Sequence, residues 1–166
     1  MPASLYIHAF SITGSIFASG ASQALNYFAL PAVLLAPTPS LKARQFVAAH
    51  WLGHITIPLT FIPCGLMHFY LAYNDATANS RLETIAGAIT ISIFPLSVVF
   101  IEKLYLYIYT LRGKKDEEIE ADLKNKGEGD LDTLIVRWQR WNTLRAALPF
   151  IGAMVSWWNL LEDVRQ

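Results

Sequence analysis

The sequence predicts an all-α integral membrane protein, a four-helix bundle that runs up-down-up-down through the bilayer. Hydrophobic residues make up 54% of the 166 residues and charged residues only 16%, a composition typical of membrane proteins. The apolar residues gather in four runs, each longer than the roughly 20 residues that cross a bilayer core. These runs lack the alternation of apolar and polar residues that strands show. We expect the spans at residues 5–35, 46–73, 82–111 and 134–161 of a single domain, 1–166.

Each run carries features that suit a membrane helix. The first run lacks the basic start and the short apolar core of a removable signal peptide. The second run contains Pro58 and Pro63, which should kink it, and Pro95 interrupts the third. Small residues that let another helix approach closely are spaced along the first run: Gly14, Ser19, Gly20 and Ser22.

The connections differ in length and charge. The first and second, "APTPSLKAR" and "NDATANSRL", are short and rich in turn-forming residues, which predicts antiparallel neighbours. The third, "RGKKDEEIEADLKNKGEGD", is long and charged. Its central part could form a short amphipathic helix that ends at Gly127, and a solvated loop is an equal alternative.

The distribution of charge predicts orientation and excludes one class of partner. Lysine plus arginine and aspartate plus glutamate number 13 each, and this neutrality argues against nucleic-acid binding. The first and third links carry most of the basic residues that flank the spans: Lys42, Arg44, Arg112, Lys114, Lys115, Lys124, Lys126 and Arg137, against Arg81 and Arg165 on the other side. This excess predicts that the first and third links are cytosolic and that both termini are lumenal or exterior. In a eukaryote we expect the protein to lie in the endoplasmic reticulum membrane. Whether it forms a homo-oligomer stays open.

Polar residues recur inside the apolar runs, where their burial in lipid is costly and marks a functional site by default. Because the chain direction alternates, the ends of the first and third runs lie at the same depth as the starts of the second and fourth. The unusual residues at that depth are Asn26, Tyr27, Gln45, His50, His54, Glu102, Tyr105, Trp138, Asn142 and Arg145. The sequence therefore predicts one site in the cytosolic half of the protein. The single cysteine, Cys64, is expected to be buried and inert.

The histidines of the second run are four residues apart, so His50 and His54 project from one side of their helix. Three roles stay open: a base or substrate-binding pair, two ligands of copper or iron with an oxygen from Glu102, or a structural pair. His68 lies eighteen residues after His50, about 27 Å along a helix, and cannot share one metal ion with it. His8 and His68 could face each other near the lumenal end, and the alternative is that both are simple interface histidines.

The polar residues of the fourth run form a single stripe. Trp138, Asn142 and Arg145 are spaced i, i+4 and i+7. The charge of Arg145 needs a partner, and Glu102 is the expected one. Extension of Arg145 toward the headgroups is the alternative. Asn26 and Asn142 could instead join helices through their amides.

Several short motifs together resemble one known family. The second run contains Gln45, Phe46, His50, Gly53 and Pro58, the third reads "FPLSVVFIEKL", and the fourth has the W-x-x-x-N-x-x-R stripe. With Gly14 and "LPAVLL" in the first run, the chain is similar over nearly its whole length to the small four-span membrane family, DUF1772, that includes the fungal anthrone oxygenases. Two departures fall in the expected site. Phe46 and His50 stand where members often have Trp and Tyr, and Glu102 and Lys103 where they often have Thr-Asn.

The resemblance implies a membrane-bound oxygenase of anthrone-like aromatic polyketides in secondary metabolism, with dioxygen as co-substrate and no required cofactor. A base would remove the acidic methylene proton, and the enolate would then react with dioxygen. His50 or His54 would be this base, and Asn142 and Arg145 would hold the substrate oxygens. The planar hydrophobic substrate would lie against Asn26, Tyr27, Gln45, Phe46, Glu102, Trp138 and Trp141.

Two other functions stay open. One is a metal-dependent membrane oxidase that binds copper or iron through His50 and His54. The other is a four-span scaffold without enzymatic activity, which would bind a partner protein through its charged third link.

Overall fold

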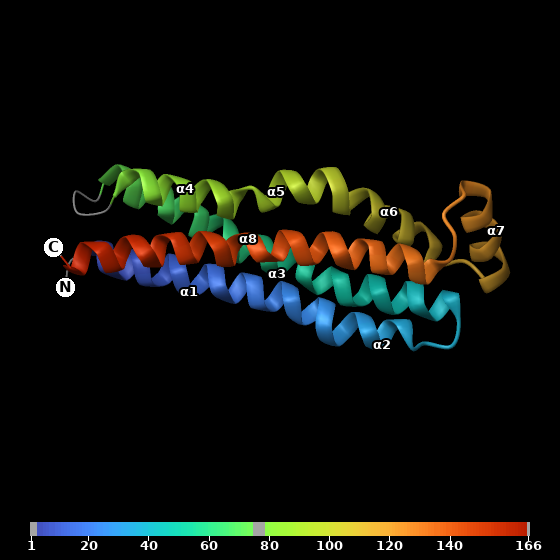
Figure 1. The fold of residues 1–166 in the computed structure, drawn as a ribbon. Helices are drawn as coiled ribbons and strands as arrows, with labels where there is room; N and C mark the ends of the chain where they lie inside the picture. The colour runs from blue at the N-terminus through green and yellow to red at the C-terminus, as the bar shows by residue number, and fades with distance from the viewer. Residues whose placement is uncertain (1–2, 75–78, 166) are drawn as a thin grey trace. The chain divides into compact units, whose positions relative to one another are not determined.

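The computed structural model describes residues 3–74 and 79–165, and every secondary-structure element within these ranges is a helix. The first stretch consists of α1 (Ala3–Ala24), the π-helical turn η1 (Leu25–Ala29) and α2 (Leu30–Leu34), and the second is α3 (Pro39–Asn74). The third contains α4 (Ser80–Ile91), α5 (Ile93–Leu96), the π-helical turn η2 (Ser97–Ile101) and α6 (Glu102–Leu111). Then follow α7 (Asp116–Lys126) and α8 (Leu131–Arg165) (Figure 1). The predicted all-α fold is confirmed. The predicted second connection lies partly outside the described residues.

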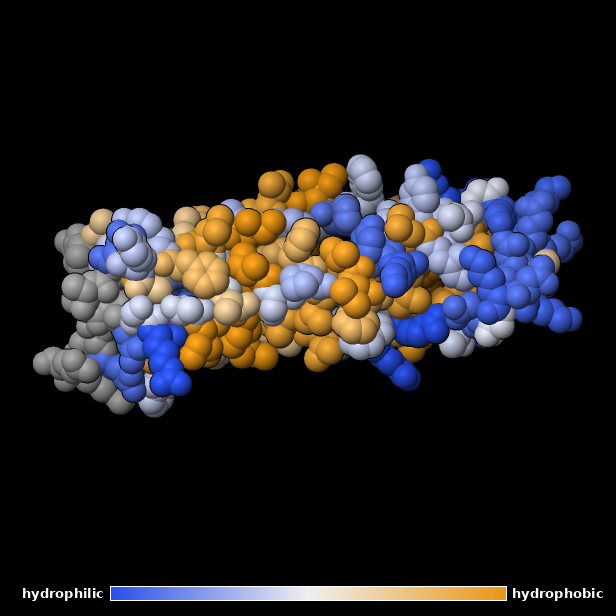
Figure 2. All heavy atoms as spheres, turned by 90° about the horizontal axis from the view of Figure 1, so that it is seen from above, coloured by the Kyte–Doolittle hydropathy of each residue, from blue (hydrophilic) through white to orange (hydrophobic). Residues whose placement is uncertain are grey.

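Two helical stretches, Pro39–Asn74 and Ser80–Leu111, are long and apolar enough to cross a membrane, as judged by length and composition. Large apolar side chains such as Trp51, Leu59 and Leu66 are exposed along the first of them. Figure 2 shows hydrophobic side chains over much of the visible surface, whereas hydrophilic side chains gather around α7. These findings indicate association with a membrane. The four-span count, the up-down-up-down bundle and the orientation stay predictions.

The third stretch is interrupted close to its proline. Pro95 has no N–H to donate to the carbonyl of Ile91, and in a continuous helix its ring would clash with that carbonyl. Accordingly, α4 ends at Ile91 and the chain turns at Ser92 before α5 begins. By contrast, α3 stays one helix of 36 residues with Pro58 and Pro63 inside it.

The charged third link forms the helix α7, and the alternative of a solvated loop is wrong. Gly127 ends α7 with a φ of 66°, a left-handed conformation that favours glycine. Ile119 and Leu123 are buried, which makes α7 amphipathic. At the start of α8, Asp130 accepts a hydrogen bond from the Thr133 backbone N–H at 2.7 Å. Hydrogen bonds from Thr133 lower the pKa of Asp130 below its usual value.

The chain divides into two compact units, each with residues from all four helical stretches. Unit 1 consists of Met1–Ala21, Thr56–Phe94 and Ala146–Gln166, and unit 2 of Ser22–Ile55 and Pro95–Arg145. The sequence predicts one domain, and that stays a prediction. The two units are therefore described separately.

Unit 1 packs its helices closely through small residues. A Cβ atom on Gly14 of α1 would lie 2.5 Å from the Sγ atom of Cys64 in α3, which is buried as expected. A Cβ atom on Gly152 of α8 would lie 2.8 Å from the Ala86 carbonyl oxygen of α4. The small-residue prediction is thus confirmed for Gly14. Gly20, by contrast, is exposed, and a Cβ atom added to it would meet no described atom within 4 Å.

Unit 2 has a larger apolar core to which α2, α3, α6, α7 and α8 all contribute. Trp138 and Phe46 are the largest of its fully buried side chains. The α7 helix joins this core through Ile119 and Leu123. Polar contacts also hold it, because the Asp116 carboxylate accepts a hydrogen bond from the Ser40 backbone N–H at 2.7 Å.

Candidate functional site

The centre of the candidate site is His50, which α3 buries in the core of unit 2 with only 3% of its surface exposed. Its ring stacks on Tyr105 of α6 with the centroids 3.9 Å apart. Trp138 of α8 meets it edge-on at 5.2 Å, and Phe46, one turn earlier on α3, lies 6.2 Å away. Three helices therefore enclose one imidazole between aromatic rings.

Polar atoms inside this enclosure are left unsatisfied. The Nδ1 atom of His50 and the indole Nε1 of Trp138 are buried and have no hydrogen-bond partner within the described part of the chain. Buried polar groups in proteins are nearly always hydrogen-bonded, so each exception needs an explanation. A bound ligand with its own donor and acceptor atoms is one such explanation.

His54 lies beside His50 but in a different environment. The two rings are 5.4 Å apart, which confirms that they share one side of α3, yet His54 is exposed. Its ring is also roughly parallel to that of Tyr105, at 6.1 Å. The structure therefore distinguishes a buried and an exposed member of the pair, which the spacing alone does not.

A network of amides joins three helical stretches in the same unit. The Asn142 side chain donates to the Oδ1 atom of Asn26 at 2.8 Å and accepts from the Nε atom of Arg145 at 2.8 Å. Arg145 also donates through Nη1 to the Ser97 hydroxyl at 2.8 Å. Asn26 and Asn142 are fully buried. Asn142 and Arg145 of the predicted stripe thus form a connected network with Asn26, whereas Trp138 does not join it.

The predicted ion pair between Arg145 and Glu102 is not formed. Glu102 is half-buried and makes no hydrogen bond or ion pair with Arg145 among the described residues. The guanidinium instead donates to the Asn142 side chain and to the hydroxyl of Ser97, because the inserted residue of the π-helical turn η2 changes which side chains of this stretch face α8. The Nη2 atom of Arg145 donates to no described residue and is available to a ligand.

Both π-helical turns contribute to this network, since Asn26 belongs to η1 and Ser97 to η2. A π-turn inserts one residue into a helix and is frequent at functional sites. The backbone carbonyl of Asn26 accepts a hydrogen bond from the Gln139 side chain at 2.8 Å. Sequence periodicity contains no signal for such turns, and Ser97 was accordingly not predicted.

The remaining predicted residues lie at the edge of this arrangement. Tyr27 is 63% exposed and Gln45 is exposed, so neither joins the enclosure around His50. Trp141 stacks on Phe100 with centroids 4.3 Å apart and is half-buried. Substrate contact by these residues stays a prediction.

Unit 1 holds a second polar cluster, which the sequence reasoning missed. Glu83 of α4 is fully buried, and its Oε2 atom lies 2.9 Å from the Nδ1 atom of His68. Its Oε1 atom accepts hydrogen bonds from Ser156 and Asn159 at 2.8 Å each and lies 3.7 Å from His8. Of the two alternatives for His8 and His68, the structure therefore agrees with the one in which they face each other, and they meet at Glu83. An acidic residue inside an apolar run was the signal that could have revealed it.

The described residues offer few ligands for a metal ion. They contain no group of three or more histidine, cysteine, aspartate or glutamate side chains placed to hold one metal ion. His50 and His54 would supply two ligands. A metal on this pair would need its other ligands from solvent or substrate.

Comparisons with known proteins place the chain among oxygenases. The sequence model of the family described as anthrone oxygenase matches residues 46–155. The monooxygenase hypC of Dothistroma septosporum is 28% identical over 87% of this chain and 77% of that protein. The anthrone oxygenase tpcL of Aspergillus fumigatus is 26% identical over 92% and 91%, and the anthrone oxygenase dmxR16 of Cryptosporiopsis sp. is 24% identical over 92% and 84%. No solved structure matches significantly.

Proposed function

The chain belongs to the anthrone oxygenase family, and from this premise we propose that it is a membrane-spanning enzyme that oxidises the methylene carbon of anthrone-like aromatic polyketides. Membership in the family makes the chain an oxygenase-type enzyme. The substrate class, the mechanism and the four-span placement in the membrane are the proposed part. Dioxygen is the co-substrate.

The observation that carries the proposal is the state of His50. It is a buried imidazole without any hydrogen bond to the described residues, enclosed by Tyr105, Trp138 and Phe46. Planar aromatic substrates pack well against such rings. A neutral imidazole whose nitrogen has no hydrogen-bond partner can act as a base. A planar substrate at this position would replace the contacts that the surrounding aromatic rings now make with His50.

The reaction needs few groups from the protein. His50 takes one proton from the methylene carbon, and the electron pair of the C–H bond delocalises into the ring system as an enolate. The enolate carbon forms a bond to dioxygen, and the proton returns to give a hydroperoxide. Loss of water breaks the O–O bond and the second C–H bond, which leaves a carbonyl. Methylene plus dioxygen thus gives carbonyl plus water, and no external reductant is consumed.

Arg145 and Asn142 are proposed to stabilise the developing charge. Arg145 follows Trp138, the ring that meets His50 edge-on, by seven residues on α8, and its Nη2 atom has no described partner. Donors that are already oriented stabilise an enolate oxygen more than solvent does. The hydrogen bonds to Asn142 and Ser97 provide this orientation for the guanidinium.

The first test is dioxygen uptake by the detergent-purified protein with unsubstituted anthrone as substrate, together with measurement of anthraquinone formation. His50→Gln should lower kcat/KM by about 100-fold or more, because general-base catalysis contributes about 10²–10⁴-fold. His54→Gln should have the smaller effect, since that ring is exposed. Equal activity of wild type and His50→Gln would contradict the assignment of the base.

Elemental analysis of the same preparations distinguishes the metal-dependent alternative. About one copper or iron per chain, lost in a His50→Gln/His54→Gln double variant, would replace the proposed mechanism by metal-assisted oxidation. Activity that survives strong chelation would count against it.

The proposed orientation is tested by labelling introduced cysteines in sealed membranes. Cys64 is buried, so Lys115→Cys and Ser80→Cys would supply the reactive thiols in an otherwise unreactive chain. A membrane-impermeant maleimide should reach Lys115→Cys from the cytosolic side and Ser80→Cys from the other. Labelling of both from one side would contradict the proposed topology.

A further inference from the structure

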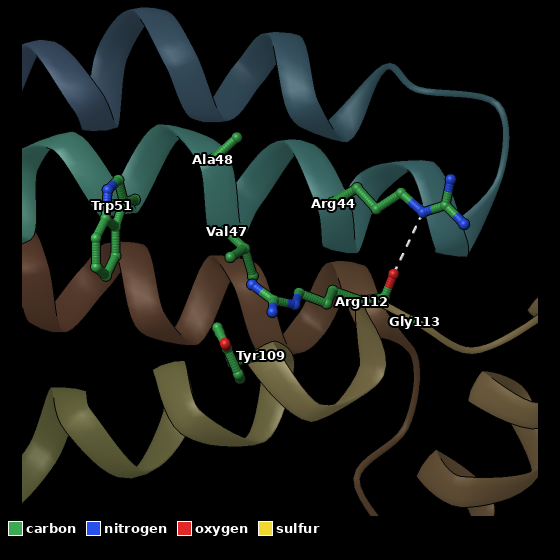
Figure 3. Close-up of a pocket in the computed structure, with 7 residues that line it drawn as sticks. All are labelled: Arg44, Val47, Ala48, Trp51, Tyr109, Arg112 and Gly113. Atoms are coloured by element: carbon green, nitrogen blue, oxygen red, sulfur yellow. Dashed lines mark hydrogen bonds between the residues drawn. The ribbon is translucent and has the colours of Figure 1, made fainter.

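Unit 2 contains an open pocket that the proposed mechanism does not use. Its volume is about 760 Å³, which lies within the range of small-molecule sites. It is formed by α3 and the end of α6, as Figure 3 shows. The lining residues are Arg44, Val47, Ala48 and Trp51 of α3, with Tyr109, Arg112 and Gly113.

The pocket carries positive charge that no acidic side chain balances. Neither Arg44 nor Arg112 forms an ion pair with a carboxylate among the described residues, and none of the lining residues is acidic. Elsewhere in unit 2 basic residues do form ion pairs, as Lys42 does with Asp132 at 2.7 Å. The two guanidiniums are therefore available to an anion from outside the chain.

The two arginines hold different positions. The guanidinium of Arg112 lies 3.8 Å from the centre of the Tyr109 ring, and Figure 3 shows it between Val47 and Tyr109. The guanidinium of Arg44 extends away from Trp51, while its Nε atom donates to the Arg112 carbonyl oxygen at 3.3 Å. Arg112 is thus the central cation of the pocket, and Arg44 lies at its far end.

Aromatic surface accompanies the charge. The side chain of Trp51 is 59% exposed and that of Tyr109 is 37% exposed, so both rings are accessible to a ligand. Guanidinium and carboxylate groups form paired, charge-assisted hydrogen bonds, and planar rings stack on Trp and Tyr. This combination of groups suits a ligand that is planar, aromatic and anionic.

The pocket also adjoins the candidate site. Tyr109 lies 6.0 Å from Tyr105, the ring that stacks on His50. Trp51 follows His50 directly in the sequence. A planar ligand against Tyr109 would therefore be separated from the proposed base by the ring of Tyr105.

We propose that this pocket binds the carboxylate of a planar aromatic substrate, with Arg112 as the anion-binding residue and Trp51 and Tyr109 as the stacking surfaces. The proposal rests on the proposed function and deepens it, because it names carboxylated anthrones as the preferred substrate class. Arg44 contributes a weaker, longer-range attraction.

The test measures equilibrium binding to the full chain in detergent with a matched pair of probes, anthraquinone-2-carboxylate and its neutral carboxamide. Both are already oxidised, so binding is separated from turnover. The wild type should bind the carboxylate with a Kd about tenfold or more below that of the carboxamide. Arg112→Gln should abolish this preference, and Arg44→Gln should reduce it less.

Two further variants control the result. Arg140 is exposed on α8 and is not a lining residue, so Arg140→Gln removes the same charge outside the pocket and should keep the preference. Ala48→Trp should fill the pocket and weaken the binding of both probes to a similar extent. These variants change exposed residues, and circular dichroism establishes that each protein keeps its helical content.

An unchanged preference in Arg112→Gln, or equal binding of both probes to the wild type, would overturn the proposal. So would Arg112-dependent binding of short-chain phosphatidate without binding of the carboxylate probe, which would make the pocket a lipid-phosphate site. Retained probe binding in His50→Gln is expected, because that residue does not line the pocket.

Measurement of turnover distinguishes a failure of this binding proposal from a failure of the proposed function. With an anthrone carboxylic acid as substrate, Arg112→Gln should raise KM about tenfold and leave kcat unchanged, and it should leave KM for unsubstituted anthrone unchanged. Absence of any wild-type turnover, with the binding preference intact, would refute the oxygenase mechanism and leave the ligand class standing. Turnover of both substrates with equal KM would refute the carboxylate site alone.

Discussion

The helix α3 buries a histidine in each of the two units, and the surroundings of these two side chains differ. In unit 1, His68 lies 2.9 Å from the carboxylate of Glu83, which Ser156 and Asn159 also contact. In unit 2, no carboxylate of the described residues pairs with His50, and the closest ring to it is that of Tyr105, with the centroids 3.9 Å apart.

The two environments differ in whether a carboxylate or aromatic rings surround the imidazole. The carboxylate of Glu83 has hydrogen-bond partners at both oxygens, whereas the Nε2 atom of His68 and the hydroxyl of Thr90, also in unit 1, have no hydrogen-bond partner among the described residues. Around His50 the buried Nδ1 atom and the Nε1 atom of Trp138 have no partner among the described residues. Unsatisfied buried atoms therefore occur in both units, and unit 2 differs in that its buried imidazole lies between aromatic rings, as the proposed reaction with a planar substrate requires.

The largest expected effect tests the structural role of unit 1. Glu83→Ala leaves the donors of His68, Ser156 and Asn159 without an acceptor, and should lower the free energy of unfolding by about 3–5 kcal/mol. Denaturant unfolding in detergent measures this loss. Oxygenase activity per folded molecule should stay near that of the wild type.

The control is Glu117→Gln, which removes an exposed carboxylate from α7 and should change stability by about 0.5 kcal/mol or less. If Glu83→Ala abolished activity while the protein kept its full stability, the catalytic centre would belong to unit 1 instead.

A middle-sized effect is expected in the amide network of unit 2. Asn142→Leu removes the acceptor of Arg145 and the donor to Asn26, and should cost about 1–3 kcal/mol of stability. Combined with Asn26→Leu, the loss should be smaller than the sum of the single losses, with a coupling energy of about 0.5–3 kcal/mol. A double-mutant cycle of denaturant unfolding measures the coupling, and additive losses would show that the two amides act independently.

The smallest expected effect concerns close packing in unit 1. Gly152→Ala would place its Cβ atom 2.8 Å from the Ala86 carbonyl oxygen. This close contact should lower the free energy of unfolding by about 1–3 kcal/mol, and the higher helix propensity of alanine should offset part of that loss. Gly20→Ala is the matched control, because no described atom lies within 4 Å of its Cβ position. It should be neutral or stabilise by up to about 1 kcal/mol. Thermal unfolding of the two variants measures the difference, and equal midpoints would contradict the packing argument.

Part of the candidate site could be predicted from residue spacing alone. Trp138, Asn142 and Arg145 share one face of a regular helix, and the structure joins the last two by a hydrogen bond of 2.8 Å. Spacing failed where the partner comes from another helix. Glu102 was the expected partner of Arg145, but Ser97 takes that position from a π-helical turn. One inserted residue rotates the following side chains around the helix, and hydrophobic periodicity does not detect it.

What the sequence by itself determined is the helical fold, the approximate helix bounds and the set of polar residues that apolar runs carry. These follow from local properties, namely the length of apolar runs, the positions of proline and glycine, and the cost of burying polar groups. Only the tertiary structure decided that His50 is buried and His54 exposed, that Glu83 joins His8 and His68, and that Arg112 has no acidic partner among the described residues. These outcomes depend on how each helix is rotated against its neighbours, and that rotation is set by the packing of whole faces.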